Sequence, residues 1–460
     1  MTQGLADVAV IGAGVVGTAI ARTLARHALD LVLLDAAPDV GTGTSKANTA
    51  ILHTGFDAKP GSLESRLLSR GSALLRSYAE AAGIPVERTG ALLVAWTPEQ
   101  AASLPAIEEN ARRNGYLAVR PLRAAELYVR EPELGPGALG ALEIPDESII
   151  CPWTTPLAFA TEAAGAGVRL LLSARVTGVA AGGDGFYQLA TTRGPVRCRW
   201  VVNAAGLNSD EVDRMFGGGG FTIRPRRGEL IVFDKLARTL IRSILLPVPT
   251  ARTKGVLVAP TVYGNVLLGP TAEDVTDVRD TATTAAGLRS LLAAGRRILP
   301  GLAEQEVTST YAGLRAATEH SDYQIYVDAE RRYACAGGIR STGLSASLGI
   351  AEHIVGQLGE AGLALRPRAC GPVPVMPYIG EAGVRPYQDA KRIAADRAYG
   401  QIVCHCERVT RGEIRDAMAS PVPPADLGGL RRRTRAMNGR CQGFYCAAAV
   451  SRLFAAGVPA

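Results

Sequence analysis

Four cysteines near the end of the chain form two close pairs. Cys404 and Cys406 are separated by one residue, and Cys441 and Cys446 by four. Four thiolates can bind a [2Fe-2S] cluster or a tetrahedral zinc ion. Paired cysteines of zinc sites usually leave roughly two to four residues between them, so the first spacing favours the cluster. The other four cysteines are scattered, and a clustered quartet in a long chain is more typical of a metal site in a reducing compartment than of disulfides.

A second motif lies at the start of the chain. Gly12, Gly14 and Gly17 follow a short β-branched run, precede a helix-forming segment, and are followed by an apolar run that ends at Asp35. In such a strand, glycine turn, helix and strand, the first glycine allows the tight turn, the second lets the backbone approach a pyrophosphate, and the third lets helix and strand pack closely. The terminal acid can accept hydrogen bonds from ribose hydroxyls. The pattern predicts a dinucleotide site.

The segments around these motifs predict an α/β chain. Residues 61–83 have helical composition, residues 91–96 and 186–199 alternate as strands and a hairpin, and residues 200–206 form an apolar strand that ends in Ala-Ala-Gly. A late glycine-rich turn leads into an apolar helix that ends near Leu358. The alternating segments at 91–96 and 186–199 predict a mixed sheet inserted between the cofactor-binding pieces.

Composition narrows the class. The chain has 460 residues, 47% of them apolar, and a net charge of +7, which is too mild to name a partner. The last 57 residues hold nine Arg, no Lys and four acids, so most of the excess belongs to the cysteine segment and gives no support to nucleic-acid binding. No uncharged apolar run is long enough to span a bilayer. Prolines at 372, 374, 377 and 386 predict an extended linker over about 366–400.

The three glycine-rich elements, in this order, resemble the D-amino-acid-oxidase-like flavoprotein family. Five further segments are similar to its glycerol-3-phosphate dehydrogenase/oxidase branch: 45–55, 253–260, 264–272, 312–315 and 343–347. The resemblance covers residues 1–365 and implies a Rossmann-like FAD-binding domain with an inserted mixed-sheet substrate domain. Its FAD-binding pieces are expected at about 1–90, 150–215 and 310–365.

FAD is the cofactor that this resemblance implies. The residues that it places at the cofactor are Gly12, Gly14, Val15, Gly17, Asp35, Ala36, Thr44, Ser45, Val176, Ala205, Gly206, Gly338, Gly343, Leu344 and Ser345.

Oxidation of a secondary alcohol needs a base for the hydroxyl proton, and an imidazole suits this role near neutral pH. The resemblance places the family's active-site histidine at His53; the alternative is a structural histidine. Arg315 and Lys254 coincide with substrate-binding positions, where a planar guanidinium and a compact ammonium would hold an anion. Each could instead be a surface charge. Thr49 and Ser341 could donate to substrate oxygens or cap turns, and Arg226 is a weaker candidate for substrate contact.

The C-terminal segment resembles the bacterioferritin-associated-ferredoxin-like [2Fe-2S] domain, in the version fused to the large subunit of anaerobic glycerol-3-phosphate dehydrogenases. This implies a small helical domain over 401–460, with Cys404, Cys406, Cys441 and Cys446 as ligands and His405 outside the ligand set. The arginines at 431–433 and 435 could stabilise the anionic cluster, dock an acidic partner or form a solvated helix face.

These features predict an FAD-dependent dehydrogenase for a small anionic secondary alcohol, with glycerol 3-phosphate as the leading substrate. A 2-hydroxy acid, an amino acid, or a non-catalytic electron-transfer or redox-sensing subunit are the alternatives. Because a [2Fe-2S] cluster accepts one electron at a time, we expect electrons to pass to a partner subunit or to quinone. We expect a cytoplasmic hetero-oligomer without a transmembrane segment, held to a membrane only through a partner.

Overall fold

The first of two large sheets carries the cofactor-binding elements. The structure is a computed structural model that describes residues 4–182, 185–249 and 255–457. In this eight-stranded sheet, β1 lies between β2 and β12 and is parallel to both. Its strands are β1 (Ala6–Ile11), β2 (Leu31–Leu34), β9 (Arg169–Leu171), β10 (Val176–Ala181), β11 (Tyr187–Thr191), β12 (Val196–Asn203), β19 (Gln324–Asp328) and β20 (Tyr333–Gly337).

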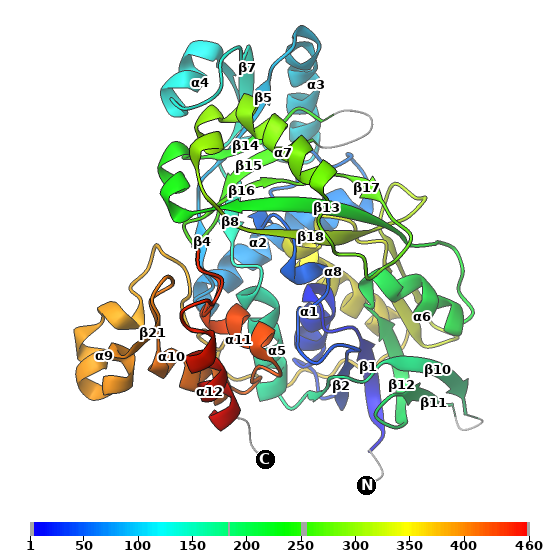
Figure 1. Ribbon diagram of the computed structural model, residues 1–460. Helices are drawn as coiled ribbons and strands as arrows, with labels where there is room; N and C mark the ends of the chain where they lie inside the picture. The colour runs from blue at the N-terminus through cyan, green and yellow to red at the C-terminus, as the bar shows by residue number, and fades with distance from the viewer. Residues whose placement is uncertain (1–3, 183–184, 250–254, 458–460) are drawn as a thin grey trace.

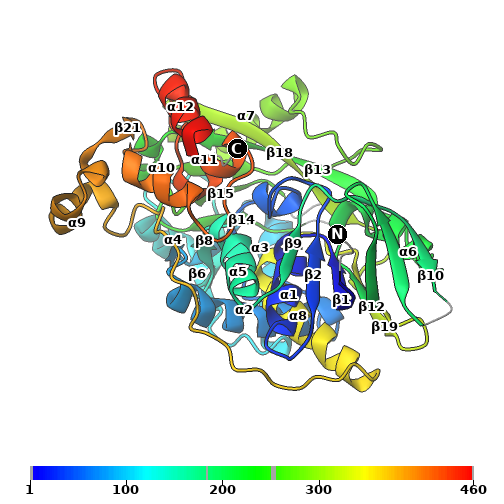
Figure 2. The ribbon, with the colours of Figure 1, turned by 90° about the horizontal axis from the view of Figure 1, so that it is seen from below.

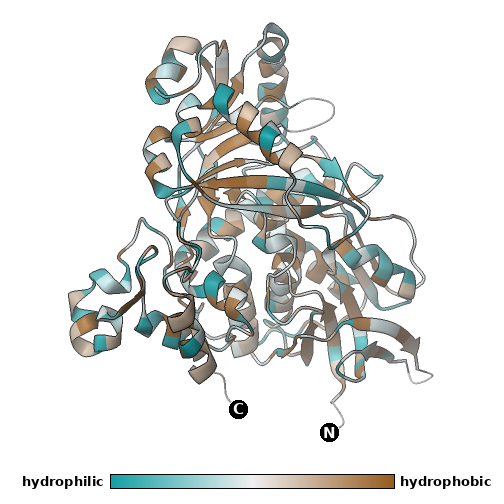
Figure 3. Cartoon of the chain, viewed as in Figure 1, coloured by the Kyte–Doolittle hydropathy of each residue, from teal (hydrophilic) through white to brown (hydrophobic). Residues whose placement is uncertain are grey.

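Helices pack against this sheet and against one another. The apolar helix α1 (Val15–Leu24) contacts α5 (Thr154–Gly165) and α8 (Gly343–Glu360), and α8 in turn contacts α2 (Leu63–Ala82). Every residue of β2 is buried, as expected for a strand covered on both faces. Brown, apolar segments run along strands of both sheets in Figure 3. This unit has the parallel core of a Rossmann-like fold.

A second, mixed sheet lies above the first in Figure 1. It is largely antiparallel, with β14 parallel to β5. Its nine strands are β5 (Ala91–Ala95), β6 (Arg120–Arg123), β7 (Gly140–Ile144), β13 (Arg224–Phe233), β14 (Ile244–Pro247), β15 (Leu257–Pro260), β16 (Val266–Gly269), β17 (Glu273–Asp274) and β18 (Val307–Ala317). The helices α3 (Pro98–Arg113), α4 (Ala124–Arg130) and α7 (Ala285–Ile298) accompany it. The α/β class with an inserted mixed sheet is therefore confirmed.

Shorter elements connect the two sheets. A three-stranded sheet of β3 (Ile51–Leu52), β8 (Ser148–Ile150) and β4 (Val86–Glu87) lies between them, and α6 (Ser209–Met215) follows β12. The strand β18 pairs with β13 along almost its whole length. Residues 310–317, which the sequence assigned to the third FAD-binding piece, therefore belong to the second sheet.

The C-terminal module is small and helical. It consists of a hairpin, β21 (Ile402–Cys404) and β22 (Val409–Thr410), and of α10 (Arg411–Met418), α11 (Leu427–Thr434) and α12 (Ala447–Gly457). Its own apolar core includes Val409, Ile414 and Leu430. The linker before it is extended only to about Arg385, because α9 (Ala390–Ala395) and flanking 3₁₀ turns occupy its second half. Figure 2 shows it crossing the outside of the first unit. Within the described ranges, no helix is both long and apolar enough to cross a bilayer.

Candidate active site and cofactor sites

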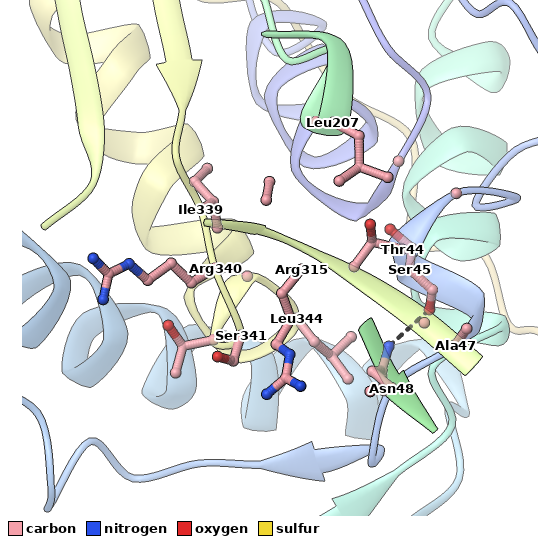
Figure 4. Close-up of a pocket in the computed structure, with 18 of the residues that line it drawn as sticks. Thr44, Ser45, Ala47, Asn48, Leu207, Arg315, Ile339, Arg340, Ser341 and Leu344 are labelled. Atoms are coloured by element: carbon pink, nitrogen blue, oxygen red, sulfur yellow. Dashed lines mark hydrogen bonds between the residues drawn. The ribbon is translucent and has the colours of Figure 1, made fainter. Parts of the chain in front are cut away.

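A cavity of about 870 Å³ is lined by residues of both sheets and of the segments that connect them (Figure 4). Sixteen of the residues that the sequence placed at the cofactor or substrate line it: Gly12, Gly14, Val15, Asp35, Ala36, Thr44, Ser45, Thr49, His53, Ala205, Gly206, Arg315, Gly338, Ser341, Gly343 and Leu344. Gly17, Val176, Ser345 and Arg226 are not among its lining residues, and Lys254 lies outside the described residues. The structure thus gathers segments that are hundreds of residues apart.

One end of the cavity has the features of a dinucleotide site. Gly12 has a φ of +106°, and a Cβ on Gly17 would lie 1.8 Å from the Gly12 carbonyl oxygen, so both positions require glycine. The Asp35 carboxylate accepts hydrogen bonds from the amides of Ala13 at 2.5 Å and Ala37 at 2.7 Å. Burial raises the pKa of Asp35, and these two amides oppose the shift. The carboxylate is therefore fixed at the mouth of the glycine turn, beside the N-terminus of α1.

The segment after β2 closes over this turn. Ser45 Oγ accepts a hydrogen bond from the amide of Val15 at 2.9 Å, and Thr44 Oγ1 donates to the Leu314 carbonyl of β18 at 2.7 Å. Asn48 Nδ2 donates to the Ser45 carbonyl at 2.9 Å, the bond drawn in Figure 4. One segment thus ties the helix N-terminus of the first unit to the second sheet.

His53 lines the cavity directly after β3, and a buried carboxylate orients its ring. Its Nδ1 lies 3.0 Å from Glu147 Oε2, and the Glu147 side chain is fully buried. The other carboxylate oxygen accepts from the amide and the hydroxyl of Thr54, at 2.7 and 2.9 Å. Ser345 Oγ accepts from the His53 amide at 2.9 Å. With Nδ1 bound to a carboxylate, the ring can carry a proton there and leave Nε2 as an acceptor.

Glu147 gave no signal in the sequence. It lies in a polar turn between β7 and β8, where acidic residues are ordinary, and 94 residues separate it from His53. Ser345, which was expected at the cofactor, accepts a hydrogen bond from the His53 amide and is not among the residues that line the cavity.

Arg315 projects from β18 into the same cavity without a carboxylate partner among the described residues (Figure 4). Its guanidinium donates to the carbonyl oxygen of Thr271 at 2.6 Å and more weakly, at 3.4 Å, to that of Arg227. Burial, reinforced by the nearby charge of Arg226, lowers the pKa of Arg315 to about 10. A half-buried cation whose hydrogen bonds go to neutral carbonyls is stabilised by an incoming anion.

Arg226 pairs with a carboxylate and does not face the cavity. It lies opposite Arg315 in the β13–β18 register, but its guanidinium forms a bidentate pair with Asp274, at 2.6 and 3.0 Å. The structure does not bring it to the cavity, because its charge is already met at the edge of the sheet. Thr49 and Ser341 do line the cavity.

The four clustered cysteines form two contact pairs in the C-terminal module. All four are free thiols: Cys404 and Cys446 are buried and hydrogen-bonded to each other, and Cys406 and Cys441 are partly exposed and hydrogen-bonded to each other. Backbone amides of Gly443, Phe444 and Tyr445 donate to the Cys441 sulfur, and the amide of Cys441 donates to Cys406. Within the described ranges, no three metal-binding side chains surround one point. Two thiolates for each of two irons, with amide donors to sulfur, fit a [2Fe-2S] cluster.

Comparison with known proteins agrees with this arrangement. Residues 7–357 match the family described as FAD dependent oxidoreductase, and residues 402–456 match the BFD-like [2Fe-2S] binding domain. The chain belongs to the FAD dependent oxidoreductase family. It is an FAD-dependent oxidoreductase with a fused [2Fe-2S] domain, and both cofactors expected from the sequence are confirmed.

Proteins similar to this oxidoreductase include enzymes named for glycerol 3-phosphate and for L-2-hydroxyglutarate. It is 33% identical to a glycerol 3-phosphate dehydrogenase of Caloramator mitchellensis, over 98% of this chain and 94% of the relative. It is 31% identical to the mitochondrial L-2-hydroxyglutarate dehydrogenase of Bos taurus, over 58% of this chain and 60% of the relative. The FAD-bound structure of L-alpha-glycerophosphate oxidase from Mycoplasma pneumoniae superposes with a TM-score of 0.76 at 25% identity, covering 81% of this chain and 98% of that one.

Replacing Glu147 with Gln in this oxidoreductase is expected to slow substrate-dependent FAD bleaching about 10- to 100-fold, less than loss of the imidazole itself, because the ring keeps its place but loses the carboxylate that fixes its tautomer. Anaerobic stopped-flow absorbance measures the rate, and its pH profile should also move. Glu131→Gln is the matched control, since Glu131 is a buried carboxylate that accepts the amides of Arg242 and Ser243 away from the cavity. Equal effects of the two variants would contradict the positioning role.

Proposed function

We propose that the protein oxidises glycerol 3-phosphate to dihydroxyacetone phosphate. The observation that carries this proposal is the pairing, in one cavity, of a carboxylate-oriented imidazole at His53 with an uncompensated guanidinium at Arg315. A secondary alcohol on a small anion needs both a proton acceptor and a fixed cation. The relatives named as glycerol 3-phosphate enzymes support the choice of a phosphate over other anions.

In this site Arg315 would hold two phosphate oxygens through its planar guanidinium. Thr49 and Ser341 would donate to the remaining oxygens, and Lys254 would add a second positive charge. His53 Nε2 would take the hydroxyl proton, and Glu147 would hold the charged imidazole that results. Bound FAD supplies the hydride acceptor. The residues that would hold it are those lining the dinucleotide end of the cavity, from the Gly12 turn, Asp35 and the 44–48 segment to the Gly338–Leu344 turn.

The [2Fe-2S] domain supplies a one-electron acceptor, so we propose that electrons leave through it, one at a time, to an acceptor outside the chain. That acceptor would be a partner subunit, an electron carrier or a quinone. We propose a division into an FAD-dependent part at 1–365, with β18 in its substrate sheet, a linker at 366–400, and the cluster domain at 401–460.

The decisive experiment is anaerobic bleaching of FAD by a panel of glycerol 3-phosphate, L-2-hydroxyglutarate, other 2-hydroxy acids and amino acids. We expect glycerol 3-phosphate to reduce the flavin at the lowest concentration. If only a 2-hydroxy acid reduced the flavin, the anionic group of the substrate would be a carboxylate and not a phosphate. A flavin that no member of the panel bleaches would favour a non-catalytic electron-transfer subunit.

Cys441→Ser is expected to abolish the cluster while leaving FAD bleaching by substrate within about twofold of wild type, because the ligand lies outside the cavity. Iron and sulfide analysis and the visible spectrum report the cluster. Cys370→Ser, which changes an exposed cysteine of the linker, is the control. A variant that loses FAD bleaching together with the cluster would show that the two sites are not separable.

A further inference from the structure

A fully buried carboxylate joins the FAD-binding unit to the [2Fe-2S] domain. Asp39 lies in the loop after β2, and its side chain has no exposed surface. It accepts hydrogen bonds from Arg433 NH1 at 2.7 Å and NH2 at 2.8 Å, and from Arg432 NH2 at 2.8 Å. Both arginines lie on α11, nearly 400 residues further along the chain. From the sequence, these arginines could stabilise the cluster, dock a partner or form a solvated helix face.

The loop that carries Asp39 also forms a wall of the cavity. Asp35, Ala36, Ala37 and Thr42 line the cavity on either side of it. Thr42 Oγ1 donates to the Asp39 carbonyl at 3.1 Å, and the amide of Gly41 donates to the Ala13 carbonyl at 2.9 Å in the glycine turn. Hydrogen bonds within this loop therefore link the ion pair to the dinucleotide end of the FAD site.

The facing surface on α11 is shaped for this carboxylate. Gly429 lies where a Cβ would come within 2.4 Å of Asp39 Oδ2. The Arg433 guanidinium is 5% exposed and also donates to the Val422 carbonyl, so its fork is fully engaged. A glycine that leaves room for the carboxylate and a nearly buried guanidinium form a complementary contact.

A second contact lies closer to the cluster ligands. The Arg435 guanidinium lies 4.3 Å from the ring centre of Tyr263, which stacks on Trp153 with 4.8 Å between centroids. Trp153 Nε1 donates to the carbonyl of Lys46, next to the cavity-lining Ser45. Lys235, in the 3₁₀ turn that follows β13, pairs with Glu407, the neighbour of Cys406, at 3.1 Å. These contacts place the cluster domain against the outer wall of the FAD cavity.

We propose that Asp39 is an ionic anchor that keeps the [2Fe-2S] domain docked on the FAD-binding loop, so that the cluster receives electrons from the FAD of the same chain. Reduced FAD holds two electrons and the cluster accepts one. The second therefore follows only after an external one-electron oxidant has taken the first from the cluster. Each transfer would remove one electron from the flavin and add one to the cluster, and over two transfers the flavin reduced by hydride uptake would lose two electrons and one proton, the proton going to solvent. A fixed domain suits such repeated transfer.

Asp39→Asn tests the anchor, because it leaves two arginines of the interface without their counter-charge. Hydrogen exchange, followed by mass spectrometry on the FAD-loaded, cluster-loaded protein, should accelerate about 100-fold or more in α11 and in residues 36–42. Gly429→Ala attacks the same contact from the other side and should have the same pattern. Glu352→Gln, which breaks an exposed ion pair with Arg70, is the matched control and should change neither segment.

The second arm rests on the proposed function. After anaerobic mixing with glycerol 3-phosphate, freeze-quenched EPR should show the reduced cluster of Asp39→Asn lagging behind FAD bleaching in the same sample by at least about ten times the lag in wild type. Protected α11 amides, or cluster reduction at the wild-type rate despite faster exchange, would overturn the anchor. If the substrate bleaches no flavin even in wild type, the proposed function fails, and the exchange arm still decides the anchor.

Discussion

His53→Asn is expected to slow reduction of FAD by glycerol 3-phosphate by about 10²- to 10⁴-fold, the usual contribution of a positioned general base. The amide can occupy the place of the imidazole but cannot accept the hydroxyl proton near neutral pH. Because Glu147 and Ser345 hold the ring and the backbone of this residue, the variant should retain the shape of the site. Single-turnover anaerobic bleaching measures the effect without any contribution from the electron acceptor.

The expected loss is confined to the chemical step. The spectrum of bound FAD and the amount of cluster should be unchanged, because His53 belongs neither to the dinucleotide end of the cavity nor to the cysteine ligands of the cluster. His353→Asn, on α8 and outside the lining of the cavity, is the control. A His53 variant that bleaches as fast as wild type would transfer the role of base to another group and leave His53 as a structural residue.

Arg315→Leu is expected to lower kcat/KM for glycerol 3-phosphate roughly 30- to 4000-fold, equivalent to about 2–5 kcal/mol, because it removes the half-buried cation that we propose binds the substrate anion. Most of the loss should appear in KM. Arg315→Lys should recover only part of it, since an ammonium keeps the charge but cannot engage two oxygens at once. Steady-state kinetics with an artificial electron acceptor measure both variants.

The pH dependence of the wild type gives an independent check. The pKa of Arg315 is lowered to about 10, so the guanidinium is charged well below that pH, where the proposal has it bind the substrate anion, and loses its charge as the pH rises through it. KM for the substrate should therefore rise steeply as the pH approaches 10.

The control for Arg315→Leu is Arg289→Leu, which changes an exposed arginine of α7 and should leave KM unchanged. If Arg315→Leu and the control had equal KM values, the anion would be bound elsewhere.

The features that could be predicted from the sequence are those in which a short spacing sets the geometry. The turn from Gly12 to Gly17 needs only the strand and helix on its two sides, and the cysteine pairs depend on single loops. The apolar run before Asp35 coincides with β2 (Leu31–Leu34), and the helical composition of residues 61–83 placed α2 within one or two residues of its ends. The helix in the second half of the linker was missed because prolines at 372–386 dominated the composition of the whole segment.

The features that only the tertiary structure decided are contacts between polar groups far apart in the chain. Nothing near His53 identifies Glu147 as its partner, and nothing near Asp39 identifies α11, because each pair meets only after the two sheets and the C-terminal domain have packed. Arg226 and Arg315 look alike as isolated arginines, yet one faces a carboxylate at the edge of its sheet and the other faces the cavity. The sequence by itself determined which cofactors this protein binds, since their motifs are local. The packing of its units decided which charges are left free for a substrate, because burial and counter-charge are properties of the assembled fold.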